Sequence, residues 1–147
     1  GAALATFAAG NACALMFSGR LADTAGRRPV IVAGTLIGGV FTVVVGFTTA
    51  LVPFLAASFV AGAGAGTAVP GLQATIGDVV GTQRSGGKVL AGFQMVQDTG
   101  AILGPVVAGV LVDVFSYQVA FTVAGLVLVL TSISWWWSRE TLPIMDP

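Results

Sequence analysis

The segment GRLADTAGRRP, residues 19–29, decides the fold of this chain. It is short and charged, with apolar sequence on both sides, and its Arg20, Arg27 and Arg28 are half of the six Lys and Arg residues. Its Asp23 is the only acid within fifty residues in either direction. Basic residues between two apolar segments are typical of a cytoplasmic loop that joins two membrane spans.

Glycine and proline in this segment predict a turn between two helices. We expect Gly19 and Gly26 to let the backbone turn where a side chain would collide. Pro29 has a fixed φ and no N–H, which suits the first turn of the following helix. Asp23 is expected to lie against a helix N-terminus, because the partial positive charge there favours an acid.

The amino-acid composition places the chain in a lipid bilayer. It is 56% hydrophobic and 8% charged, whereas a soluble domain has about 25% charged residues. The net charge is zero, so nothing indicates a nucleic-acid partner. There is no His, and Cys13 is the only cysteine, so we expect no histidine metal site, no internal disulfide and no cofactor.

The hydrophobic segments predict an all-α integral membrane protein with five transmembrane helices. A span needs roughly 20 apolar residues to cross a hydrocarbon core of about 30 Å. Residues 29–77 carry no charge, and this length suits two spans with a turn near residues 48–53. The five expected spans are residues 2–18, 30–47, 54–77, 89–111 and 117–136. Because the chain starts with Gly inside an apolar run, we interpret it as lacking an upstream part.

The charges predict the orientation in the membrane. All six Lys and Arg residues fall in the first loop, the third loop or the tail, and the fourth loop carries Asp113 instead. Since basic residues collect on the cytoplasmic side, we expect the C-terminus in the cytoplasm. Trp135, Trp136 and Trp137 precede Arg139 and fit an aromatic belt at that interface.

Small residues predict where helices approach closely. Gly62 and Gly66 are four residues apart in the third span, so they share one helix face and allow backbones to approach. Pro70 is expected to bend the same helix. In the fourth span, Gly100, Gly104 and Pro105 predict a second close contact and a second bend.

With its spacing G-x-x-x-D-x-x-G-R-R, the opening segment resembles the loop signature of the major facilitator superfamily, the twelve-span secondary transporters. The matching positions are Gly19, Asp23, Gly26, Arg27 and Arg28. An ordinary cytoplasmic loop that obeys the positive-inside rule is the alternative. The resemblance implies that the five spans are most of one six-helix half of a twelve-helix fold, whose N-terminal half is missing here.

Three features favour the C-terminal half. Ser58 stands where the family's first half carries an Arg, and residues 97–109 resemble the eleventh span of drug-efflux members. The ending WWWSRETLP, residues 135–143, resembles a chain terminus. Against this, residues 100–109 also resemble the antiporter signature of the fifth span. We interpret the chain as the second half, of the drug or metabolite:proton antiporter type.

The resemblance implies secondary active transport of a small solute by alternating access, with proton-coupled efflux through the plasma (inner) membrane. Its partners would be the bilayer, a small-molecule substrate, protons and the missing N-terminal half. An enzyme is not expected, since the sequence has neither a phosphate-binding G-x-x-x-x-G-K-S/T loop nor a cluster of acids, bases or metal ligands. An uptake symporter of the same fold, or a truncated membrane module without transport of its own, are the alternatives.

The resemblance also implies a gate at the cytoplasmic face. Arg27 would pair with Asp78 at the end of the third span. Asp23 would face the N-terminus of a helix from the missing half and thereby lock the outward-open state. Between exposed groups such a pair contributes only about 0–1 kcal/mol, and partial burial raises that contribution.

Polar residues inside the spans are candidates for contact with substrate or protons. The family implies that the first, third and fourth spans line the central cavity, while the second and fifth are peripheral. The candidates are Asn11, Gln73, Gln94, Gln97 and Asp98. For Asn11 and Gln73 the alternative is a hydrogen bond between helices, worth about 0.6 kcal/mol in membranes.

Asp98 is the acid that lies deepest in a span. It follows Lys88 by ten residues, about 15 Å of helix. Near mid-membrane a charge costs roughly 2.5–3.5 kcal/mol, so Asp98 should face a cavity, take up a proton or have a partner. It shares a helix face with Gln94, Gln97 and Ala101. A proton carrier or substrate contact, and a structural residue near the cytoplasmic edge, are both open.

Overall fold

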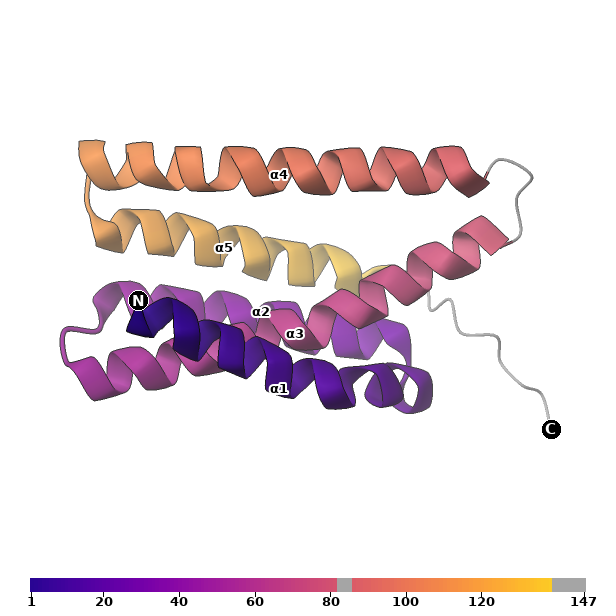
Figure 1. The fold of residues 1–147 in the computed structure, drawn as a ribbon, viewed down its shortest axis with the longest axis horizontal. Coiled ribbons are helices and arrows are strands. Elements are labelled where there is room, and N and C mark those ends of the chain that lie inside the picture. Colours follow the sequence, from indigo (N-terminus) through magenta and orange to yellow (C-terminus); the bar gives the residue numbers. More distant parts are fainter. Residues whose placement is uncertain (82–85, 139–147) are drawn as a thin grey trace.

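The computed structural model describes residues 1–81 and 86–138, and within them all regular structure is helical (Figure 1). The helices are α1 (Ala2–Ala25), α2 (Arg27–Phe47), α3 (Leu51–Gly81), α4 (Gly86–Val114) and α5 (Tyr117–Trp136). Each is long and apolar enough to cross a membrane, and each expected span lies inside one of them. Arg84, Arg139 and the rest of the tail lie outside the described residues, so the parts of the orientation and terminus arguments that use them stay predictions.

The helices run alternately up and down, so one end of the bundle collects the basic residues. The end of α1, the start of α2, the end of α3, the start of α4 and the end of α5 all lie on the right of Figure 1. This basic end therefore holds Arg20, Arg27, Arg28 and Lys88 of the described residues. Asp113 lies at the opposite end of α4.

The turn in the charged segment is a single residue. Helix α1 continues through Gly19 to Ala25, and Gly26 alone separates it from α2, with φ of 100°. The turn expected at Gly19 is therefore wrong. Residues 20–25 include good helix formers, and buried Ala22 anchors the last turns of the helix, so the chain stays helical. Only glycine readily adopts the backbone angle found at Gly26.

Helices α1 and α3 meet backbone to backbone, as the small residues predicted. A Cβ added at Gly62 would collide with the carbonyl oxygen of Phe7, and one at Gly66 with that of Asn11. From the other side, a Cβ at Gly10 would collide with the carbonyl oxygen of Phe59. Glycine is thus required on both helices for this approach.

Close approach at glycine residues also joins α2 to α3 and to α5. A Cβ at Gly34 would lie 2.8 Å from the backbone of Gly64 in α3. A Cβ at Gly39 would lie 2.8 Å from the carbonyl oxygen of Gly125 in α5. The centre of the bundle is therefore built largely from glycine backbone, and Ile31 is the largest side chain that is fully buried.

Two buried serines add hydrogen bonds between helices. Ser18 Oγ of α1 donates to the carbonyl oxygen of Gly66 in α3 at 3.1 Å. Ser132 Oγ of α5 donates to the carbonyl oxygen of Val32 in α2 at 2.9 Å. Both contacts lie where glycine or a neighbouring small residue lets the backbones come close. No local pattern in the sequence predicts either contact.

Helix α4 stands apart from this packed group, and the close contact expected at its glycines is absent among the described residues. No residue of α4 is buried, and a Cβ at Gly100 or Gly104 would meet nothing within 4 Å. Instead of a close contact, a cavity of about 600 Å³ separates α4 from α5. Figure 1 shows α4 as one continuous helix, which has Pro105 inside it, and the bend expected there stays a prediction. A small residue creates a close contact only where a partner helix is present to fill the space.

Pro70 of α3 also leaves its helix intact. Helix α3 runs without interruption from Leu51 to Gly81 with Pro70 inside it. In a membrane a proline within a helix is tolerated when its neighbours satisfy the freed carbonyl group. The bend expected at Pro70 stays a prediction.

Candidate functional site

The structure pairs Arg27 with Asp78 at the basic end. Arg27 is the first residue of α2, and Asp78 lies in the last turn of α3. Nη1 of Arg27 forms an ion pair with Oδ2 of Asp78, and the two side chains are 13% and 33% exposed. Nη1 also donates a hydrogen bond to the carbonyl oxygen of Ala74 at 2.9 Å. Arg27 thus fastens the start of α2 to the end of α3 through both a charge and a backbone group.

Asp23 lies at the C-terminal end of α1. It is exposed in the last turn of α1, and the first turn of α2 contains no acid. The C-terminal end of a helix carries a partial negative charge, which disfavours an acid by roughly 0.3–1 kcal/mol. The expected contact of Asp23 with a helix N-terminus of the missing half stays a prediction.

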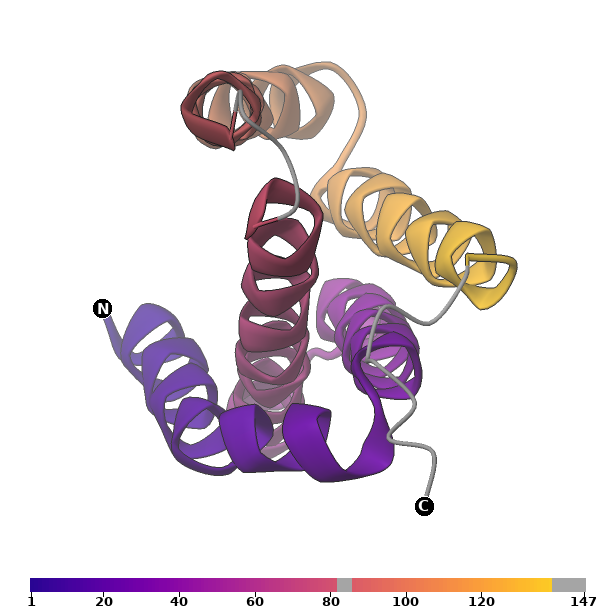
Figure 2. The same ribbon diagram turned by 90° about the vertical axis from the view of Figure 1, so that its right-hand side faces the viewer.

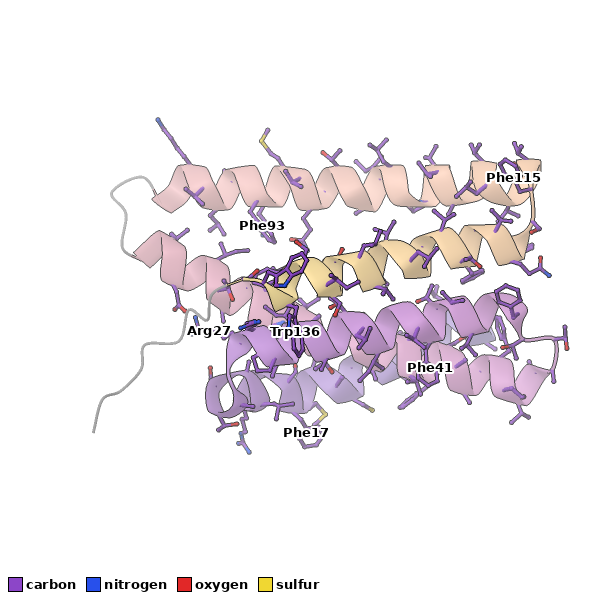
Figure 3. The ribbon with its side chains drawn as sticks, turned by 180° about the vertical axis from the view of Figure 1, so that it is seen from behind. Phe17, Arg27, Phe41, Phe93, Phe115 and Trp136 are labelled. Atoms are coloured by element: carbon purple, nitrogen blue, oxygen red, sulfur yellow. The ribbon has the colours of Figure 1, made fainter. Side chains whose placement is uncertain are left out.

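A second arginine contact at the basic end was not anticipated from the sequence. The guanidinium carbon of Arg28 lies 5.8 Å from the ring centroid of Trp136 in α5. Figure 3 shows Trp136 beside the start of α2, near Arg27. The sequence placed both the tryptophans and the arginines at the cytoplasmic interface but could not say which would meet.

The helices divide into two sides. Figure 2 shows α3 in the middle, with α1 and α4 bordering one side of the bundle and α2 and α5 on the other. The candidate polar residues all come from α1, α3 and α4. The implied division into cavity-lining and peripheral helices stays a prediction.

The candidate polar side chains are largely open to their surroundings. The side chains of Gln73, Gln94, Gln97 and Asp98 are exposed, and Asn11 is half-buried. Among residues 1–81 and 86–138, no group of three or more His, Cys, Asp or Glu residues could hold a metal ion.

The face of α4 that carries Asp98 does not point at α5. The residues of α4 that border the cavity toward α5 are Gly100, Leu103, Gly104, Val107, Ala108 and Leu111. At 3.6 residues per turn, the face with Gln94, Asp98 and Ala101 lies roughly 100° round the helix from that side. Figure 3 shows Phe93 pointing from α4 toward the rest of the bundle, in keeping with this assignment. The polar face of α4 is thus turned away from α5.

The described helices and the ion pair at their basic end define an all-α, multi-pass membrane protein. The family model described as Major Facilitator Superfamily matches residues 1–145. The chain belongs to this family of transporters, and its five helices form part of a major-facilitator fold.

Several similar proteins carry the name "Multidrug resistance protein MdtL". The chain is 30% identical over 146 residues to "Multidrug resistance protein MdtL" of Klebsiella pneumoniae strain 342, covering 99% of this chain and 37% of that protein. It is 30% identical over 142 residues to the protein of that name from Escherichia coli O45:K1, covering 96% and 36%. The Vibrio parahaemolyticus protein is 28% identical over 142 residues, with the same coverage of 96% and 36%.

The chain therefore spans little more than a third of the length of these relatives. No solved structure shows significant similarity to the chain.

Proposed function

We propose that this chain is the C-terminal half of a secondary active transporter that exports a small solute by alternating access in exchange for protons. The observation that carries the proposal is the Arg27–Asp78 ion pair, formed by the charged segment that resembles the family's loop signature. Relatives named for multidrug resistance favour export of drug-like or metabolite-like solutes. The remaining helices would be supplied by the missing N-terminal half.

The ion pair would act as a gate because it links helices that belong to different sides of the bundle. Helix α3 borders the side with the polar residues, whereas α2 lies on the other side. Closing the cytoplasmic face would bring Asp23 of α1 to a helix N-terminus of the other half, where the helix dipole stabilises an acid. A small energy is enough to operate such a gate. A ligand or a bound proton shifts the equilibrium between two conformations only by the difference in its affinity for them.

The test of the proposed function is flux through the complete protein in proteoliposomes. Substrate transport should follow an imposed pH gradient and stop when the gradient is collapsed. Residues 1–147 reconstituted alone should insert without transporting, because five helices leave α4 and its polar face uncovered. Saturable flux from residues 1–147 alone would contradict the half-transporter proposal and favour a self-sufficient module.

The gate has its own test in a double-mutant cycle. Arg27→Ala and Asp78→Ala should each lower the transport rate, and the double variant should be little worse than either single one. Groups in direct contact typically show coupling of about 0.5–3 kcal/mol, and partial burial of this pair places it above a fully exposed one. Arg20→Ala, on an exposed arginine of α1, is the matched control. Additive losses would mean that the two residues do not act as a pair.

The orientation follows from the basic end and can be measured by labelling. In a background without other reactive cysteines, Gly87→Cys near the start of α4 should react with a membrane-impermeant maleimide only from the cytoplasmic side. Thr49→Cys, between α2 and α3, should react only from outside. Both positions are exposed, and Gly87 has open space around it. Labelling of Thr49→Cys from the cytoplasm would reverse the proposed topology.

A further inference from the structure

A groove runs along the outer face of α2 at the basic end. It has a volume of about 540 Å³ and is bordered by Ala25 at the end of α1, by Trp136 of α5, and along α2 by Arg28, Pro29, Val32, Ala33 and Leu36. The five residues from α2 recur at helical spacing, so they form one continuous stripe. Trp136 of α5 closes one side and is 60% exposed.

The chemistry of the groove changes along its length. At one end stands the guanidinium of Arg28, and the rest of the stripe is apolar. From Arg28 to Leu36 the helix rises about 12 Å, which covers most of one leaflet of a hydrocarbon core about 30 Å thick. A ligand that fits would be anionic at the interface and apolar toward the middle of the membrane.

The contact between Arg28 and Trp136 suits an anion at the mouth of the groove. The guanidinium carbon lies over the indole of Trp136, 5.8 Å from the ring centroid, within the range of a cation–π contact. The planar fork of N–H donors on a guanidinium matches the geometry of a phosphate. The mouth of the groove therefore combines a cationic group suited to a phosphate with an aromatic ring.

We propose that this groove binds an anionic phospholipid, with its phosphate on Arg28 and one acyl chain along Val32, Ala33 and Leu36. The groove is lined mainly by α2, and none of the candidate polar residues of α1, α3 and α4 borders it, so its occupant is a lipid rather than the transported solute. The basic end adds the positive charge of Arg20, Arg27 and Lys88, which attracts anionic headgroups to the same interface. The lipid stabilises the junction of α2 with α5, whatever solute the transporter carries.

The experiment is native mass spectrometry of the complete protein in detergent, titrated with phosphatidylglycerol or phosphatidylcholine. The protein should retain phosphatidylglycerol about tenfold more tightly, the scale of one good charge-assisted contact. Arg28→Ala should remove this preference. Ala33→Trp fills the groove from an exposed position and keeps Arg28, so it should weaken binding of both lipids. Arg20→Ala, which removes the same charge outside the groove, should change binding by less than about twofold.

Several outcomes would overturn the proposal. Equal losses in Arg20→Ala and Arg28→Ala would show a diffuse attraction to the basic end instead of a bound lipid. Competition by free glycerol phosphate as effective as that by the lipid would show a headgroup site without a chain groove. If Arg28→Ala does not fold, Ala33→Trp decides, because unchanged lipid binding in that variant excludes the groove.

Discussion

Replacing Asp98 with asparagine is expected to lower the rate of gradient-driven transport by on the order of 10²-fold. Loss of a positioned proton-transfer group has an effect of this size. Asparagine keeps the size and the hydrogen-bonding capacity of the side chain but cannot take up or release a proton at neutral pH. Asp98 lies twelve residues after the start of α4, about 18 Å along the helix axis. A carboxylate at such a depth is costly unless it faces a cavity, binds a proton or has a partner.

The measurement separates coupling from structure. The Asp98→Asn variant of the complete protein should lose uptake driven by a pH gradient but keep exchange of labelled for unlabelled substrate, because exchange requires no net proton movement. Asp113→Asn makes the same substitution in the same helix at its opposite end and should behave as wild type. Loss of both activities together with a lower melting temperature would assign Asp98 a structural role. Wild-type rates and pH dependence would exclude it as proton carrier and as essential substrate contact.

Gly62→Ala is expected to destabilise the complete protein, although alanine is the better helix former. Its Cβ would collide with the carbonyl group of Phe7, which is backbone and cannot rotate away. Helices α1 and α3 would have to separate, and overpacking of this kind typically costs about 1–3 kcal/mol. Ser18 would also lose its hydrogen bond to Gly66 as the two helices part.

The matched control for this variant is Gly77→Ala in the same helix, where a Cβ meets nothing within 4 Å. There the gain in helix propensity should show alone, stabilising the helix by roughly 0.8–1 kcal/mol at most. Thermal unfolding of the two purified variants in detergent should therefore shift in opposite directions. If both shift together, the backbone contact between α1 and α3 is not what Gly62 supplies.

Where the sequence succeeded, it did so through patterns that act locally or along one helix. Long uncharged runs predict membrane spans because the cost of exposing the backbone in lipid leaves little alternative to a helix. Gly62 and Gly66 could be assigned to one face by their spacing alone. The Arg27–Asp78 pair came from a resemblance, and the structure brings the two side chains together.

The contacts that the sequence did not predict correctly depend on neighbours that are distant in the sequence. Gly100 and Gly104 repeat the spacing of Gly62 and Gly66, yet no backbone approaches them among the described residues. The same pattern gives opposite outcomes because packing requires a partner helix. Arg28 and Trp136 are more than a hundred residues apart, and no local signal pairs them.

The prediction of a turn at Gly19 was wrong for a different reason. A glycine in a charged segment permits a turn but does not require one. The chain reverses at Gly26, where the backbone adopts a positive φ, and the preceding residues remain helical.

Because Gly26 is the whole connection between α1 and α2, these two helices have almost no slack at the basic end. One residue contributes only two soft dihedral angles, and neighbouring Cα atoms are held 3.8 Å apart. In the proposed gate, a tilt at the end of α1 would reach Arg27 after a single residue and would shift its side chain relative to Asp78.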